Sequence, residues 1–498
     1  MKKAVAMFLA LSIAVSLVGC GGSGSSSGNT TQPGTTGSTG SGDSGYKDTL
    51  TVVLQTDAGT LSPFELNSGN MKRIARPILE PLVYYDANGK LVNILIDSHE
   101  YNDDCTELTL HLTKGILFHN GEELKAEDVK FTIEGYFNGN TKSDVSKIDV
   151  ENIEIVDDYT IKLPTADGIP NSTLLDYLKN VQIVNKKFME SESNTSTNMV
   201  GTGPYKLVEY VSGDHLTYEL FDQYHGAYDA VGEDGYGKTK TLVQRFISES
   251  STAMIELEGG NVDLVTDPLT ADIERVESGS VTGIQAITGP LLNLYFVAFN
   301  CGEGICSDVR VRQAIAYATN KSDIQIAAFN SYSEEANSPI PKDSVGYNSK
   351  FDTNPYEYNV DKAKELLQAA GVPEGTEITL VIDSGAYYAA IADQLIYQLN
   401  RAGLSVKLTQ YDTATVNDII FNSNDWNMVL RNYTCIGEPQ TSLDLYGKAS
   451  LSDLGGSVCT RLLNDPIATG ELADLLSEVP TKADYDERCA VYTEIQIS

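Results

Sequence analysis

Residues 107–131 read ELTLHLTKGILFHNGEELKAEDVKF and contain a strand, a turn and the start of a helix. Leu108, Leu110 and Leu112 alternate with polar residues, which is typical of a strand with one buried face. An Asn-Gly pair marks a turn, and helical periodicity begins at Ala126. A strand followed by an amphipathic helix indicates that both element types contribute to the core.

The chain on either side of this stretch changes character. The earlier part holds a first strand at 50–54, a helix at 68–80 and hairpins at 83–94 and 153–163. The later part alternates helices with strands, which predicts a mixed α/β chain with several subdomains. The later elements are helices at 309–316, 361–370 and 391–401 and strands at 404–408 and 425–431.

Length and charge exclude some classes of function. The 498 residues correspond to roughly two to four domains, and a composition of 41% hydrophobic and 21% charged residues is that of a globular protein. The formal charge of −34 argues against nucleic acid as a partner and against adsorption to anionic lipid. Only five histidines are present, which argues against a histidine-rich metal centre.

The N-terminus has the features of a secretory signal peptide. Lys2 and Lys3 precede the apolar residues 4–18, a run shorter than the ~20 residues that a transmembrane helix needs. Residues 17–20 (LVGC) resemble the bacterial lipoprotein box, which implies a signal peptide at 1–19 and lipidation of Cys20. The alternative is an ordinary cleaved signal followed by a chance cysteine.

Residues 20–46 are dominated by Gly, Ser and Thr and predict a flexible tether. Its root-mean-square reach is roughly 25–30 Å, so the folded body is expected to stay close to a membrane. The predicted location is the outer face of the bacterial cytoplasmic membrane, on the extracellular or periplasmic side.

Seven cysteines are present, and two of them lie close together in the sequence. Cys301 and Cys306 could close a small disulfide loop, or they could be two buried free thiols. Zinc is less favoured because no second Cys or His pair occurs at matching spacing.

Signatures of enzymes are missing from the sequence. Nucleotide-binding glycine loops, the HExxH zinc motif and the GxSxG nucleophile motif do not occur in a usable context. No carboxylate pair is singled out among the 69 acidic residues. The missing motifs are weak evidence, because a catalytic carboxylate pair leaves no sequence signature. The expectation is a protein that is not an enzyme and that carries no cofactor and no metal.

Six segments, in order, resemble the family 5 extracellular solute-binding proteins of ABC transporters, the group that contains peptide, oligopeptide and nickel binders. The resemblance covers nearly all of residues 47–498, and Gly201, Gly203 and Pro204 within it are interpreted as turn and strand-entry residues. The matching segments are LSPF at 61–64, the opening stretch at 107–131, GTGPY at 201–205, IELEGGNVDLV at 255–265, FN at 299–300 with DVRVRQAI at 308–315, and NVDKAKELL at 359–367 with Gly371.

The resemblance implies a periplasmic-binding-protein-like class II α/β fold with two lobes, a hinge and an extra subdomain inserted in the first lobe. Lobe I is expected at 47–86 plus 200–290, the inserted subdomain at 87–199 and lobe II at 291–498. In the family the chain finally returns to lobe I, and that return is expected to be missing here.

The resemblance also suggests where a ligand binds. Residues 431–439 (RNYTCIGEP) correspond to a family segment that often fixes a peptide ammonium, but the expected Asp falls on Cys435 and the expected Trp on Asn432. An earlier aromatic position falls on Thr413. A thiol is no counter-charge unless it ionises, so another carboxylate, or a ligand without an ammonium, is required. The predicted ligand-binding residues are Tyr411, Asp412, Thr413, Arg431, Asn432, Tyr433, Cys435 and Glu438.

Several functions fit this resemblance. The leading hypothesis is a monomeric binding protein that captures a peptide-like solute in an interlobe cleft and delivers it to an ABC permease. Alternatives are the same fold binding an oligosaccharide or a metal chelate, a signal-peptide receptor or adhesin without transport, and a secreted hydrolase on the same tether.

Overall fold

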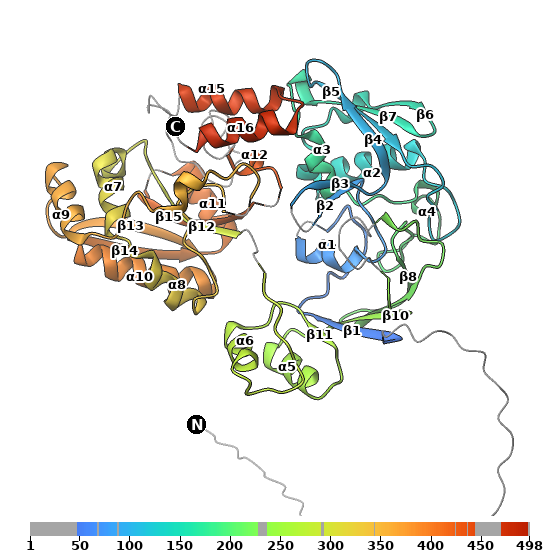
Figure 1. Ribbon diagram of the computed structural model, residues 1–498, viewed down its shortest axis with the longest axis horizontal. Coiled ribbons are helices and arrows are strands. Elements are labelled where there is room, and N and C mark those ends of the chain that lie inside the picture. Colours follow the sequence, from blue (N-terminus) through green and yellow to red (C-terminus); the bar gives the residue numbers. More distant parts are fainter. Residues whose placement is uncertain are drawn as a thin grey trace, which may run out of the picture. The chain divides into compact units, whose positions relative to one another are not determined.

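The structure is a computed structural model, and its described residues all belong to one compact unit that begins at Lys47. The predicted signal peptide, Cys20 and the tether lie outside the described residues. The described residues (Figure 1) comprise 47–66, 69–86, 89–227, 237–289, 293–342, 344–423, 425–435, 437–443 and 470–496.

The first sheet combines the start of the body with a later segment. Its strand order is β11-β1-β10-β9-β8, with β1 parallel to β10 and β11 and the other pairs antiparallel. Beside it lie helix α1 and helices α5 and α6. The bounds are β1 Thr49–Leu54, β8 Tyr205–Val211, β9 His215–Leu220, β10 Thr241–Phe246, β11 Leu264–Val265, α1 Gly69–Ala75, α5 Ser250–Glu258 and α6 Thr270–Glu277.

Helix α1 is shorter than the helix predicted at 68–80. It ends at Ala75, two residues before Pro77. Proline disfavours a helical conformation at the residue before it and has no N–H to donate, so the apolar pattern continues through Leu79 without a helix. The predicted strand at 50–54 is confirmed by β1.

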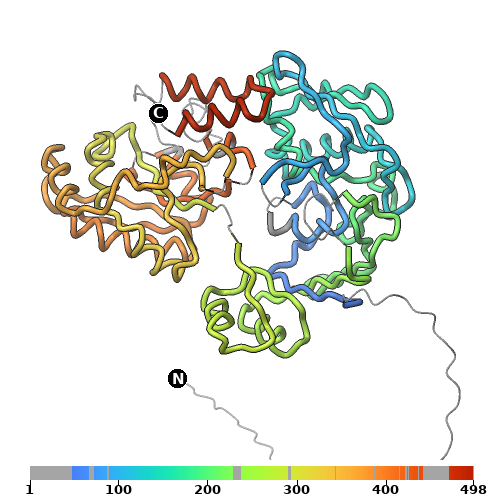
Figure 2. The backbone as a smooth tube through the Cα atoms, in the orientation of Figure 1, coloured from blue at the N-terminus to red at the C-terminus, as the bar shows by residue number. Residues whose placement is uncertain are grey.

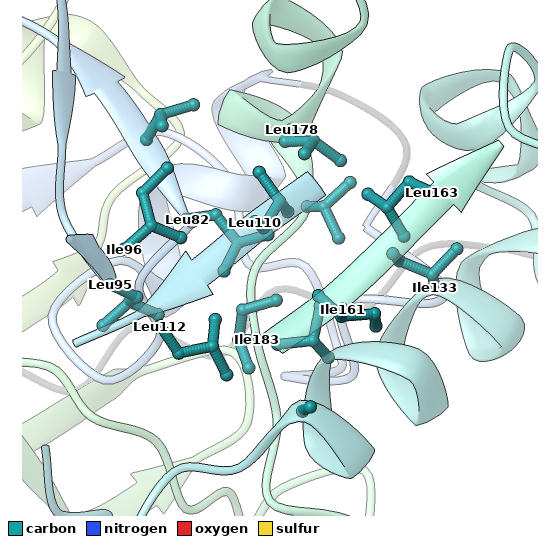
Figure 3. Close-up of a cluster of buried hydrophobic side chains, with 14 of the residues drawn as sticks. Leu82, Leu95, Ile96, Leu110, Leu112, Ile133, Ile161, Leu163, Leu178 and Ile183 are labelled. Atoms are coloured by element: carbon teal, nitrogen blue, oxygen red, sulfur yellow. The ribbon is translucent and has the colours of Figure 1, made fainter. Parts of the chain in front are cut away.

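The second sheet is antiparallel, with strand order β4-β5-β7-β6, and a separate hairpin pairs β2 with β3. Ile161 and Leu163 of β7 lie beside Ile133 of helix α2, and Leu110 and Leu112 of β5 belong to the same buried cluster (Figure 3); all of these side chains are at most 3% exposed. The bounds are β2 Val83–Tyr85, β3 Leu91–Asn93, β4 Ile96–Tyr101, β5 Glu107–Leu112, β6 Glu154–Asp157, β7 Thr160–Pro164, α2 Ala126–Asn138, α3 Leu174–Tyr177 and α4 Lys186–Met189.

The third sheet has the order β12-β15-β13-β14, in which β13, β14 and β15 run parallel and β12 runs antiparallel to β15. The yellow β12 therefore lies beside the orange β15 (Figure 2), although they are far apart in the sequence. The bounds are β12 Asn293–Phe299, β13 Thr376–Asp383, β14 Leu404–Tyr411, β15 Met428–Thr434, α7 Val309–Ala318, α8 Lys321–Phe329, α9 Val360–Ala369, α10 Ala386–Arg401 and α11 Thr413–Asn422.

Helices cover both faces of the third sheet. Ile378, Leu380 and Ile382 of β13 pack with helices α7, α9 and α10. Val381, between the last two, packs on the opposite face with Val416 of α11. This alternation follows from the period of two along a strand that is buried on both faces. Trp426 is fully buried on the α11 face, as its position near an apolar strand predicts.

The last described segment forms a helical pair. Helix α12 spans Gln440–Leu443, α15 spans Glu471–Glu478 and α16 spans Tyr485–Ile495. Ser172, between β7 and α3, donates from its backbone N–H to the carbonyl of Pro480 at 2.8 Å and from its hydroxyl to Val479 at 3.0 Å. The pair is thereby bonded to the segment that follows the second sheet.

Of the two alternatives for Cys301 and Cys306, the structure shows free thiols. The Cys301 thiol approaches the carbonyl of Phe299 at 3.6 Å. Cys306 is fully buried, and burial raises the pKa of its thiol to about 12. It packs as a small apolar side chain in the core of the third sheet.

Candidate functional site

The candidate site is the carboxyl edge of the third sheet. The three parallel strands end there, at Asp383, Tyr411 and Thr434, and Thr434 pairs with Asn293 at the start of β12. Helix α10 connects β13 to its neighbour β14, whereas α11 leads back across β13 to β15. These two consecutive connections therefore run in opposite directions along the sheet, with α10 and α11 on opposite faces of it, and ligands of open α/β sheets bind where the direction of connection reverses.

A buried ion pair lies at this edge. Arg431 donates from Nη1 to Oδ2 of Asp383 at 2.8 Å and from Nη2 to Oδ1 of Asn417 on α11 at 2.9 Å. The Arg431 and Asp383 side chains are 8% and 6% exposed. Both residues lie on the α11 face of their strands, because they continue the alternation set by Val429 and Val381. Arg431 thus has a structural partner, while its contact with a ligand stays a prediction.

The predicted residues at the end of β14 lie at the same edge. Tyr411 is 39% exposed, and its carbonyl accepts from the backbone N–H and the hydroxyl of Ser384 at 2.8 and 2.9 Å. Asp412 caps α11, accepting from the N–H of Thr415 at 3.0 Å and from its hydroxyl at 2.7 Å. Thr413 is the first residue of α11 and is exposed. Asp412 therefore has a structural role at this edge, as the N-cap of α11.

Asn432 belongs to a polar chain on the other face of the sheet. The Tyr388 hydroxyl donates to its Oδ1 at 2.6 Å, and its Nδ2 donates to Oδ1 of Asn293 at 3.2 Å. Burial, followed by the negative charge of Asp383, raises the pKa of Tyr388 to about 12, so its hydroxyl remains a donor at neutral pH. Tyr433 donates to the carbonyl of Pro339.

Aromatic rings gather beside Asn432. The ring of Tyr295 lies 5.6 Å from that of Tyr388, and Tyr387 stacks on Phe329 with centroids 5.1 Å apart and planes at 20°. Tyr387 is 44% exposed. The position where the resemblance leads one to expect Trp thus holds a small amide, and tyrosines from other elements supply aromatic surface nearby.

Cys435 and Glu438 differ from the other predicted residues in their surroundings. Cys435 is 1% exposed. The Glu438 carboxylate accepts from Arg488 Nε at 2.7 Å, from Arg488 Nη2 at 2.5 Å and from the Tyr492 hydroxyl at 2.9 Å. Both its oxygens are therefore bound to helix α16. The structure brings 411–413 and 431–433 to one edge, whereas Glu438 faces the C-terminal helices.

Sequence reasoning missed Asp383, Tyr387, Tyr388 and Asn417. A usable signal was present for three of them, because the segment DSGAYY (383–388) follows a strand directly and opens a helix, where α/β proteins place ligand-contacting residues. Nothing local points to Asn417, which reaches Arg431 only because α11 crosses the sheet.

The described residues contain neither a cluster of metal-ligating side chains nor a membrane-spanning helix. No group of three or more His, Cys, Asp or Glu side chains there could hold a metal ion. Among the described helices, none combines the length and the apolar character that crossing a bilayer requires.

A family model describes most of the chain. Residues 90–451 match the model of the bacterial extracellular solute-binding proteins, family 5. The glutathione-binding protein GsiB of Pectobacterium atrosepticum is 26% identical over 360 residues, which are 71% of this chain and 67% of that protein. The dipeptide-binding protein of Escherichia coli is 27% identical over 319 residues, which are 57% of this chain and 56% of that protein.

Solved structures show the same fold. The ABC transporter substrate-binding protein CtaP of Listeria monocytogenes superposes with a TM-score of 0.73 at 22% identity, covering 90% of each chain. The fold is therefore the two-lobed, periplasmic-binding-protein-like class II α/β fold, as expected. The chain belongs to the family 5 bacterial extracellular solute-binding proteins. Members of this family are solute-binding components of ABC transporters on the extracellular or periplasmic side, and they are binding proteins rather than enzymes.

Proposed function

We propose that the protein captures a peptide-like solute at the carboxyl edge of the third sheet and delivers it to an ABC permease. The observation that carries this proposal is the convergence of three parallel strand ends and two helix starts at one edge. That edge presents a buried ion pair, amide groups and tyrosine rings, which together suit a ligand with both polar and apolar parts. The two relatives named above bind glutathione and dipeptides according to their names, and both ligands are peptides.

We assign the lobes as the sequence predicts. Lobe I comprises 47–86 and 200–290, the inserted subdomain 87–199 and lobe II 291–498, and the solute binds between the lobes. The shared sheet of β1 with β8–β11 supports the discontinuous lobe I. The separate sheet of β4–β7 supports the insertion.

Solute binding is tested on the purified full-length chain without its signal peptide. Native mass spectrometry identifies any solute that remains bound, and thermal unfolding is followed with tripeptides, glutathione, an oligosaccharide and a nickel–histidine chelate. A ligand at 100 times its Kd adds ~2.7 kcal/mol of stability. We expect the tripeptides and glutathione to raise the unfolding temperature, and the oligosaccharide and the chelate to leave it unchanged. A shift only with the sugar or the chelate would reject the peptide assignment, and cleavage of the peptide during incubation would favour the hydrolase alternative.

Membrane attachment rests on Cys20. Lipidation at this residue would tether the folded body to the outer face of the cytoplasmic membrane, and the monomer would meet its permease there. Cys20→Ser is expected to move the protein from the membrane fraction to the soluble fraction of the producing cells. A variant that stays in the membrane fraction would contradict lipidation at Cys20, and Cys301→Ser serves as the cysteine control.

A further inference from the structure

A hollow of about 580 Å³ opens on the second sheet, at the end of β5, beside the start of β4 and the turn between β6 and β7. It lies on the outer face of the sheet, where His111 points, because the neighbouring Leu110 and Leu112 are buried in the core. None of the lining residues belongs to the third sheet, and the volume is within the roughly 300–1,000 Å³ of small-molecule sites. The polar lining includes Asp97, His111, Lys114, Asp157, Tyr159 and Thr160.

The strand register brings this polar lining together. Paired residues form one row across the four strands β4, β5, β7 and β6, namely Ser98, His111, Thr160 and Asp157. Neighbouring strands lie ~4.8 Å apart, so the row crosses roughly 14 Å of the sheet. The register shifts beside this row in both edge strands, and the shift in β4 makes Asp97 the extra residue. Bulges of this kind redirect a side chain and are frequent beside functional sites.

Two opposite charges in the hollow are not neutralised by a close partner. Among the described residues, the Asp97 side chain forms no hydrogen bond or ion pair, and its backbone carbonyl accepts from Asn93. The Lys114 ammonium lies 5.0 Å from the centre of the Tyr159 ring and attracts Asp157 from beyond ion-pair distance. Asp157 itself accepts from the N–H of Tyr159 at 2.8 Å. Asp97 and Lys114 are therefore the charges that a ligand can reach.

This arrangement restricts the chemistry of the ligand. A solute with one ammonium and one carboxylate satisfies both charges, whereas a simple cation or anion satisfies only one. The walls of a hollow reduce screening by water, so charges act more strongly there than on a flat surface. A saccharide fits less well, because the Tyr159 ring that it would contact already carries the ammonium of Lys125 at 3.9 Å from its centre. The His111 ring contacts Thr160 through Nδ1 at 3.4 Å, which leaves Nε2 for a hydrogen bond to the ligand.

We propose that this hollow is a second ligand site, in which Asp97 binds the ammonium and Lys114 the carboxylate of a small zwitterion such as an amino acid. The site is separate from the one proposed for the transported solute, and neither depends on the other. Both charged residues belong to the region of the second sheet, so the proposed inserted subdomain has a binding role of its own.

The test measures binding of glycine, β-alanine, γ-aminobutyrate and 6-aminohexanoate by calorimetry to the full-length chain without its signal peptide. The series varies the distance between the two charges, and we expect one member to bind best. Asp97→Asn and Lys114→Met are each expected to weaken its binding roughly fivefold, the upper range for a pair that is open to water. The amide of that amino acid should be insensitive to Lys114→Met, and its N-acetyl derivative should be insensitive to Asp97→Asn.

Glu100→Gln and Lys90→Met are matched controls, because they remove exposed charges of the same signs outside the hollow and should leave binding unchanged. Urea unfolding checks that all variants fold, as expected for exposed positions. Binding that neither Asp97→Asn nor Lys114→Met weakens would place the zwitterion elsewhere and overturn the assignment. Absence of binding by every member of the series overturns it as well. Tighter binding of maltotriose that Asp97→Asn weakens would replace the zwitterion with a saccharide.

Discussion

At the residue scale, His119 shows how one buried ring joins two segments. Its Nε2 lies 2.9 Å from the carbonyl of Gly203, and the N–H of Gly201 donates to its Nδ1 at 3.4 Å. The neutral ring with its proton on Nε2 satisfies both contacts, whereas protonation of Nδ1 would place two donors face to face. Burial lowers the pKa of His119 from 6.5 to about 4.

This pKa predicts a loss of stability in acid. Between pH 6.5 and 4 the unfolded chain binds a proton at this residue and the folded chain does not, so unfolding becomes more favourable as the pH falls. The loss is complete below pH 4 and reaches roughly 3 kcal/mol. We expect urea unfolding at pH 7, 5.5 and 4 to show wild type losing stability relative to His119→Gln. Asn120→Ala controls for the same turn, and parallel profiles of wild type and His119→Gln would contradict the prediction.

Asp412 provides a second prediction at this scale, because it caps α11 and also belongs to the predicted ligand site. Asp412→Ala is expected to lower the free energy of unfolding by ~1 kcal/mol, whereas Asp412→Ser should retain most of the cap. Calorimetry of peptide binding to the Ser variant then separates the effect of the Asp412 charge on binding from the effect of the cap on stability. Weaker binding by the Ser variant at unchanged stability supports a ligand role, and unchanged binding assigns Asp412 to capping alone.

At the scale of elements, the turn at 201–205 fits against the chain that leaves α1. The N–H of Gly203 donates to Ile78 at 2.8 Å, and that of Tyr205 donates to Pro77 at 3.0 Å. A Cβ on Gly201 would lie 2.1 Å from the carbonyl oxygen of Ile78. The glycines are therefore required by backbone approach, which agrees with their interpretation as turn residues.

Gly201→Ala is expected to destabilise the protein by roughly 3 kcal/mol, the upper range for overpacking, because the atom it meets belongs to the backbone and cannot rotate away. Gly289→Ala is the matched control, since nothing lies within 4 Å of its Cβ position. Thermal and urea unfolding of the two variants checks the difference. Equal stability would mean that the two backbones separate easily.

Local elements were largely predictable from sequence, and their partners were not. The helices predicted at 309–316 and 361–370 are confirmed by α7 and α9, and their ends follow from short-range chemistry: Asp308 caps α7, and Gly371 comes directly after the C-cap of α9. Helix α10 begins at Ala386, whereas the sequence predicted a start at 391. The prediction missed the first turn because that turn carries no apolar periodicity. The contact of Asp383 with Arg431 depends on β13 pairing with β15 as well as with β14, and a strand order of this kind leaves no local trace.

At the scale of the whole molecule, a buried ion pair connects the C-terminal helix α16 to the segment that follows β15 of the third sheet. Arg488 and Glu438 have side chains 8% and 11% exposed. Arg488 Nη1 also donates to the carbonyls of Lys482 and Ala483 at 2.9 and 2.8 Å. The N–H of Glu438 approaches the hydroxyl of Tyr85 at 3.4 Å, so segments from early, middle and late parts of the chain meet at this carboxylate.

Removing one partner of this pair should therefore destabilise the folded chain as a unit. We expect Arg488→Met to cost ~3–5 kcal/mol, because it leaves a buried charge without its counter-charge. Adding Glu438→Met removes that charge and should recover part of the loss, while the carbonyls of Lys482 and Ala483 remain without their donor. The double-mutant cycle is measured by urea unfolding, with Lys362→Met in an exposed pair on α9 as the control expected to cost ~0–1 kcal/mol. Additive losses from the two substitutions would show that Arg488 and Glu438 stabilise the protein independently, and the C-terminal helices would then be held by their apolar contacts and by Ser172.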